Sequence, residues 1–106
     1  MTKSTMPSRG ATRRLRALMC IGYSAAHLSR LLGLSYGTVN RILHSEDTPI
    51  KAGTFKLIDN LYEELSMKPL NQMSHSISRA KSDARRRGWH PPLAWDDIDR
   101  DKDPNS

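Results

Sequence analysis

Cysteine, aromatic side chains and long apolar runs are all scarce in this chain of 106 residues. Its single cysteine, Cys20, permits no internal disulfide, so we expect a reducing, intracellular setting. No uncharged run approaches the length of about 20 apolar residues that a membrane-spanning helix needs. Residues 1–10 lack the apolar core of a signal peptide. We therefore expect a cytoplasmic protein with no membrane partner.

Motifs for metal binding and catalysis are also missing from the sequence. It contains neither a Cys-x-x-Cys pair nor a His-Glu-x-x-His helix, and the aspartates after residue 95 lack the Gly and Glu of a calcium-binding loop. There is no phosphate-binding glycine loop and no serine, histidine and aspartate set that the helical pattern brings together. We therefore expect no enzyme, no catalytic residue, no metal, no cofactor and no small-molecule ligand. The four histidines are widely separated: His27, His44, His75 and His90.

Basic residues are abundant, with a net charge of +6 and a pI near 9.9. The excess is concentrated in two segments, because residues 1–51 have a balance of +6 and residues 75–95 one of +4. Residues 52–74 and 96–106 are acidic, at −1 and −3. This distribution favours a polyanionic partner, although charge alone does not distinguish DNA from RNA or an acidic membrane.

Residues 24–44 have the pattern of two short helices joined at Gly33. Ser24 and Ser35 stand where helix N-caps are expected, and Gly33 suits the left-handed conformation of a tight turn. The second helix, about residues 35–44, has one apolar face and one polar face. The apolar face contains Val39, Ile42 and Leu43, and the polar face contains Ser35, Tyr36, Asn40, Arg41 and His44. This is a helix-turn-helix, a motif that places its second helix in the DNA major groove.

Three further helices are expected around this motif. The first covers about residues 11–20, with Arg13, Arg14 and Arg16 turned outward, where they contact phosphates or form a solvated basic face. Another covers about residues 51–65, and its apolar stripe is Phe55, Ile58, Leu61, Tyr62 and Leu65. The last covers residues 76–87, after a linker over 67–74, and ends at Gly88.

Arg85, Arg86 and Arg87 at the end of the last helix have two interpretations. They provide additional nucleic-acid contacts, or they complement the helix dipole as a solvated helix end. Trp89 and Trp95 follow, and we expect them to cover the core, together with Leu93 and Ile98, rather than to stack on bases.

The segment from Gly33 to Ile42, Gly-Leu-Ser-Tyr-Gly-Thr-Val-Asn-Arg-Ile, resembles the lambda-repressor-like (Xre/Cro-type) helix-turn-helix family. The likeness covers about residues 11–66, although Ala25 stands where many members have a glutamine. Residues 85–97 are similar to the ending of small helix-turn-helix proteins of actinobacteria and their phages. The resemblance implies a repressor-like fold and a DNA-binding regulator that is nucleoid-associated when bound.

The expected DNA contacts follow from side-chain chemistry. An asparagine amide pairs with adenine and an arginine with guanine, whereas hydroxyl groups and backbone amides bind phosphates. Gly37 lets the backbone approach a phosphate or base edge, or is simply tolerated in the helix. The candidate base contacts are Tyr36, Asn40, Arg41 and His44, and the candidate phosphate contacts are Ser24, His27, Ser35, Gly37, Thr38, Arg13 and Arg14.

The sequence thus predicts an all-α, compact five-helix, repressor-like domain that binds double-stranded DNA and represses transcription, as a monomer or a homodimer. Residues 1–10 form a flexible basic arm, 11–66 the DNA-binding domain, 67–95 a linker, basic helix and Trp/Pro segment packed on it, and 96–106 a disordered acidic tail. The alternative is a protein-interaction module that docks on polymerase or another protein through residues 51–65 or the segment Trp89 to Ile98.

Overall fold

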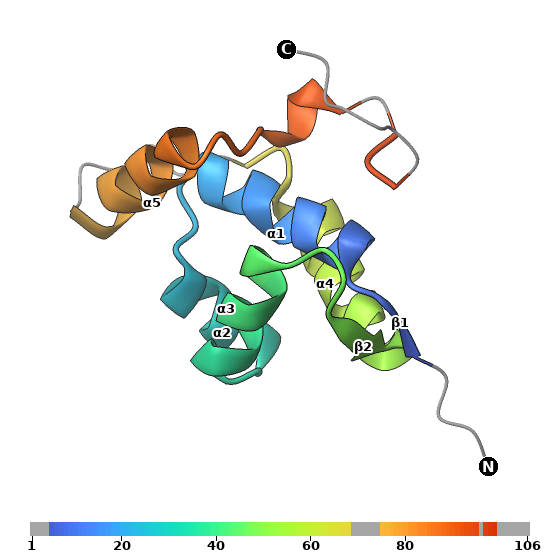
Figure 1. Cartoon of the computed structure of the whole chain (residues 1–106). Coiled ribbons are helices and arrows are strands. Elements are labelled where there is room, and N and C mark those ends of the chain that lie inside the picture. Colours follow the sequence, from blue (N-terminus) through green and yellow to red (C-terminus); the bar gives the residue numbers. More distant parts are fainter. Residues whose placement is uncertain (1–4, 69–74, 96, 100–106) are drawn as a thin grey trace.

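The computed structural model describes residues 5–68, 75–95 and 97–99, and these are predominantly helical (Figure 1). All five expected α-helices are present in this part of the chain. They are α1 (Arg9–Cys20), α2 (Ala25–Leu32), α3 (Tyr36–His44), α4 (Ala52–Leu65) and α5 (His75–Arg86). The prediction of an all-α domain is therefore confirmed.

Helix α1 lies at the centre of the molecule, packed against α3, α4 and α5 (Figure 1). Its apolar residues recur at helical spacing, and Leu15 and Leu18 are completely buried. Helix α4 contributes Ile58, Leu61 and Tyr62 to the same core, as its apolar stripe predicts. Burial raises the pKa of the Cys20 thiol to about 11, so this cysteine is a packing residue at neutral pH.

Two short strands were not expected. Strand β1 (Thr5–Pro7) pairs antiparallel with β2 (Pro49–Lys51), and Met6 lies opposite Ile50. The prediction of a flexible arm over residues 1–10 is therefore wrong for residues 5–10, because β1 is paired and α1 begins at Arg9. Residues 1–4 lie outside the described residues. Three-residue strands that contain proline have no periodic signal, so only their pairing across the chain defines them.

The C-terminal segment folds back onto α1. After Gly88, whose φ of +78° ends α5 as expected, a short 3-10 helix covers Pro92–Ala94. Trp95 and Ile98 pack on the domain, but Leu93 is 81% exposed, so its expected packing is wrong.

The predicted disordered tail over 96–106 is wrong at Asp99. Its carboxylate contacts the Arg14 guanidinium at 2.6 Å and approaches α1 so closely that a Cβ at Gly10 would meet it. Asp96 and residues 100–106 lie outside the described part of the chain, as does most of the expected linker, residues 69–74.

Candidate nucleic-acid interface

Local hydrogen bonds determine where α2 and α3 begin and end. The Ser24 hydroxyl accepts a hydrogen bond from the His27 amide at 3.1 Å, and the Ser35 hydroxyl accepts one from the Thr38 amide at 3.2 Å. Gly33 has a φ of +71°, a conformation that costs glycine little. The two predicted N-caps and the predicted turn are therefore confirmed.

Helix α3 is held at its C-terminus by side chains of α1. The Thr12 hydroxyl lies 2.6 Å from the Ile42 carbonyl and 3.0 Å from the Ser45 carbonyl, and Arg16 Nε donates to the Leu43 carbonyl at 2.7 Å. The last carbonyls of a helix have no partner within it, so these bonds satisfy groups that burial would otherwise penalise. They also fix the position of α3 on α1.

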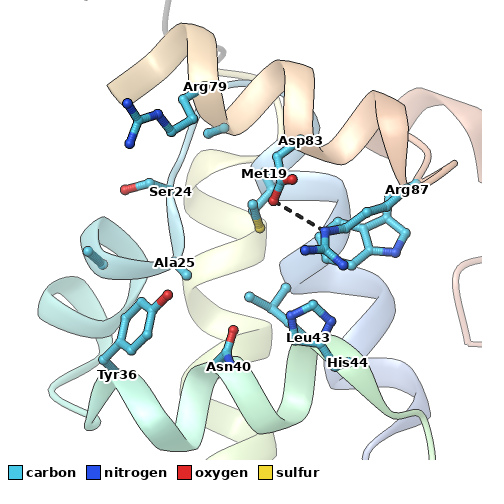
Figure 2. A pocket seen from close by; sticks show the side chains of 13 residues that line it. Met19, Ser24, Ala25, Tyr36, Asn40, Leu43, His44, Arg79, Asp83 and Arg87 are labelled. Atoms are coloured by element: carbon cyan, nitrogen blue, oxygen red, sulfur yellow. Dashed lines mark hydrogen bonds and ion pairs between the residues drawn. The ribbon is translucent and has the colours of Figure 1, made fainter. Parts of the chain in front are cut away.

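The polar side of α3 divides into two rows. Gly37 and Arg41 are exposed, and nothing lies within 4 Å of the position that a Cβ of Gly37 would occupy. Tyr36, Asn40 and His44 form the second row, which faces α5 (Figure 2). The helix therefore presents one row to open solvent and one to a neighbouring helix.

A groove of about 380 Å³ separates the second row from α5 (Figure 2). Tyr36 and Asn40 point into it from α3, Arg79 and Asp83 line it from α5, and Arg87 lines it from the turn that follows α5. The other lining residues are Met19, Ser24, Ala25, Ala26, Leu43, His44, Ala80 and Trp89. Four predicted contacts, Ser24, Tyr36, Asn40 and His44, are thus brought together, whereas Arg41 and Gly37 lie outside the groove.

The α5 wall of the groove is basic. Asp83 accepts a hydrogen bond from Arg86 at 2.9 Å and one from Arg87 at 3.2 Å. The bond from Arg86, with that from Arg87, lowers the pKa of Asp83 below its usual value. Arg79 is exposed and has no ion pair within the part of the chain that the structure describes. The groove lining therefore contains two arginines, Arg79 and Arg87, and one carboxylate, Asp83, whose charge is offset by Arg86 and Arg87.

Trp89 lies at the end of the groove next to the C-terminus of α3. Its ring is 5.8 Å from the ring of His44, and the guanidinium groups of Arg16 and Arg87 lie 5.0 and 5.5 Å from its centre. Guanidinium groups at this distance from an indole ring are attracted to its face. Trp89 therefore connects the ends of α1, α3 and α5, as its expected packing role requires.

The outward orientation expected for Arg13 and Arg14 is wrong. The Arg14 side chain is 8% exposed, and its guanidinium is bonded to Asp59 at 3.2 Å and to Asp99 at 2.6 Å. The hydrogen bond with Asp99 raises the pKa of Arg14. Arg13 is buried as well, donates to the Ile98 carbonyl at 3.0 Å and lies 4.6 Å from the centre of the Trp95 ring. Both arginines are therefore covered by the C-terminal segment and cannot serve as surface phosphate contacts.

The remaining predicted residues are dispersed. His27 is half-buried beside Tyr23, with ring centres 5.5 Å apart, and Thr38 lies beside Ser35 on the exposed surface. Arg85 faces away from the groove and, with Lys81, lines a smaller depression beside Cys20. The sequence analysis missed Arg79. Arg79, Asp83 and Arg87 follow one another at intervals of four residues, which places them on one side of α5 and the turn after it. This spacing does not indicate which helix that side faces.

None of the helices in the described ranges is long and apolar enough to cross a membrane. Within the same ranges, no group of three or more histidine, cysteine, aspartate or glutamate residues is placed to hold a metal ion. Comparison with protein-family models, curated proteins and solved structures gave no match.

Proposed function

We propose that this chain binds double-stranded DNA sequence-specifically by inserting α3 in the major groove, and that it regulates transcription, most simply as a repressor that occludes a promoter. The observation that carries the proposal is the exposed row of α3. Gly37 and Arg41 face open solvent on a helix whose opposite face is locked into the core by Val39, Ile42 and Leu43. A rigid helix that presents an exposed arginine beside a glycine fits the element that reads the major groove.

The chemistry of Arg41 and of the polar residues near it supports the proposal. Arg41 has no partner among the described residues, so its guanidinium is available for a bidentate contact with guanine. Asn40 provides an amide that matches an adenine edge, and the hydroxyls of Ser24 and Ser35 lie at the starts of α2 and α3. Base recognition and phosphate binding then come from neighbouring elements of one rigid surface.

The alternative, docking on another protein through the segment Trp89 to Ile98, has less support. Trp89, Trp95 and Ile98 are packed on the domain, and the exposed apolar residue of this segment is Leu93. An anchor already buried in its own chain is not free to bind a partner. Helix α4 likewise directs its apolar stripe into the core.

Selection of a preferred duplex from random DNA at physiological salt tests the proposal. At low salt a protein of charge +6 binds DNA of any sequence, so such binding is no evidence of sequence recognition. We expect Arg41→Ala and Asn40→Ala each to weaken binding to the selected duplex by about 1 to 3 kcal/mol. Lys56→Ala, an exposed charge on α4, is the control and should bind as the parent does. If both α3 variants bind as the parent does, or if no sequence is enriched, the proposal fails.

The selected sequence also reports the binding stoichiometry. A palindrome with half-sites about one helical turn apart indicates a dimer, and an asymmetric site indicates a monomer.

A further inference from the structure

We infer that the groove between α3 and α5 seats one sugar-phosphate strand of the DNA duplex, with Arg79 as a phosphate-binding residue. The inference rests on the proposed function and extends it. It adds to major-groove recognition by α3 a second contact, made by α5 on the backbone that borders the major groove.

The position of the groove follows from the shape of the duplex. A helix that occupies the major groove, which is about 12 Å wide, has a phosphate backbone on either side of it. Helix α5 faces α3 across the groove, on the side of Tyr36 and Asn40 (Figure 2). A backbone strand that borders α3 on this side therefore passes between the two helices.

The groove has the hydrogen-bonding groups that a phosphodiester strand requires. The Tyr36 hydroxyl projects from α3, and the Arg79 guanidinium projects from α5 above Ser24 (Figure 2). Tyr36 is 56% exposed, so its hydroxyl is accessible. Three small apolar residues, Ala25, Ala26 and Ala80, also line the groove, and their short side chains leave room for a sugar.

Charge favours an anionic occupant. The lining contains two arginines and one carboxylate, Asp83, which is bonded to Arg86 and Arg87. Arg79 lies on the same side of α5 and has no ion pair in the described part of the chain. An arginine without a carboxylate partner retains its capacity for a bidentate bond with phosphate.

Helix α5 contains its own control. Arg85 is exposed as Arg79 is, but it faces the depression formed with Lys81 and Cys20, on the other side of α5 from the groove. Arg79→Ala and Arg85→Ala change the net charge equally and place alanine in the same helix. A difference between these two variants therefore reports position and not charge.

The experiment measures the affinity of the full chain for the selected duplex between 50 and 300 mM salt. We expect Arg79→Ala to raise Kd about three- to tenfold at physiological salt, on selected and random duplexes alike, and to reduce the slope of log K against log salt by about 1. Arg85→Ala should leave both quantities close to those of the parent. Asp83→Asn removes the carboxylate from the groove and should tighten binding.

A second measurement locates the contact. Each phosphate beside the selected site is replaced in turn by an uncharged methylphosphonate. One or two adjacent replacements should weaken binding by the parent and have no further effect on Arg79→Ala. Unfolding curves of both variants should match the parent, because the replaced side chains are exposed.

Distinct outcomes separate this inference from the proposed function. If Arg79→Ala behaves as Arg85→Ala does while Arg41→Ala weakens binding, the groove does not seat a DNA strand and the proposed function stands. If Arg41→Ala and Asn40→Ala also bind as the parent does, the proposed function fails. If Arg79→Ala weakens binding but no single methylphosphonate removes the difference, the groove has another occupant and the inference is overturned.

Discussion

The arginines of α1 have a different environment from those of α3 and α5. Arg13, Arg14 and Arg16 are covered by other parts of the chain, and each has a hydrogen bond with a carbonyl or a carboxylate. Arg41 and Arg79 are exposed and have no ion pair in the described residues. Arginine side chains therefore stabilise the domain in α1. In α3 and α5, Arg41 and Arg79 remain accessible to solvent.

This comparison changes the meaning of the charge distribution. The basic excess of residues 1–51 includes three α1 arginines that form ion pairs with Glu46, Asp59 and Asp99. The surface available to a polyanion is then defined by the arginines that lack such partners. A high net charge favours a polyanionic partner but does not indicate which face of the protein would bind it.

The largest expected effect is that of replacing Arg14, whose side chain is 8% exposed and pairs with two carboxylates. Arg14→Ala leaves Asp99 and Asp59 without their cation and removes the guanidinium 5.1 Å from the Phe55 ring. Removing one partner of a buried pair costs about 3 to 5 kcal/mol, and the partial exposure of both carboxylates reduces this to about 2. Denaturant unfolding measures the loss. Arg85→Ala, at an exposed position, is the control. An equal loss in the free energy of unfolding of both variants would show that the buried arginine is no more important for stability than the exposed one.

A smaller effect is expected at Arg16, which connects α1 to α3. Arg16→Lys keeps the charge but loses the Nε bond to the Leu43 carbonyl and the planar contact with Trp89. We expect a loss of about 1 kcal/mol in the free energy of unfolding, with faster amide hydrogen exchange in the last turn of α3. Arg30→Lys, on the exposed side of α2, is the matched substitution. Unchanged exchange in α3 would show that Arg16 does not anchor this helix.

The smallest effect concerns Asp83, which pairs with exposed arginines. Because its folded pKa is lowered, the pairing stabilises the fold above the ordinary carboxyl pKa of about 3.9 and is lost as pH falls through the folded value. The free energy of unfolding should change little, since exposed ion pairs contribute weakly. An NMR titration of the Asp83 carboxyl should give a midpoint below 3.9 that rises in Arg86→Gln and in high salt. A midpoint at 3.9 in the parent would contradict the pairing.

Much of the candidate site is local and is therefore encoded in consecutive residues. Ser24, Gly33 and Ser35 each act on atoms within a few positions of themselves, so capping and turn chemistry place α2 and α3 without knowledge of the fold. The apolar spacing of Val39, Ile42 and Leu43 likewise decides which side of α3 is buried. These features were predicted correctly because their causes lie within one turn of helix.

The surroundings of these helices depend on residues far away in the chain. Periodicity showed that the α1 arginines share a polar side, but Trp95 and Asp99 cover that side from more than 80 positions later. The pairing of β1 with β2 and the groove between α3 and α5 arise in the same way. The sequence by itself determined the helices, the N-caps of α2 and α3, and the exposed side of α3. Tertiary structure alone decided which arginines are buried and that α5 faces α3, because burial and charge pairing depend on contacts that no local pattern records.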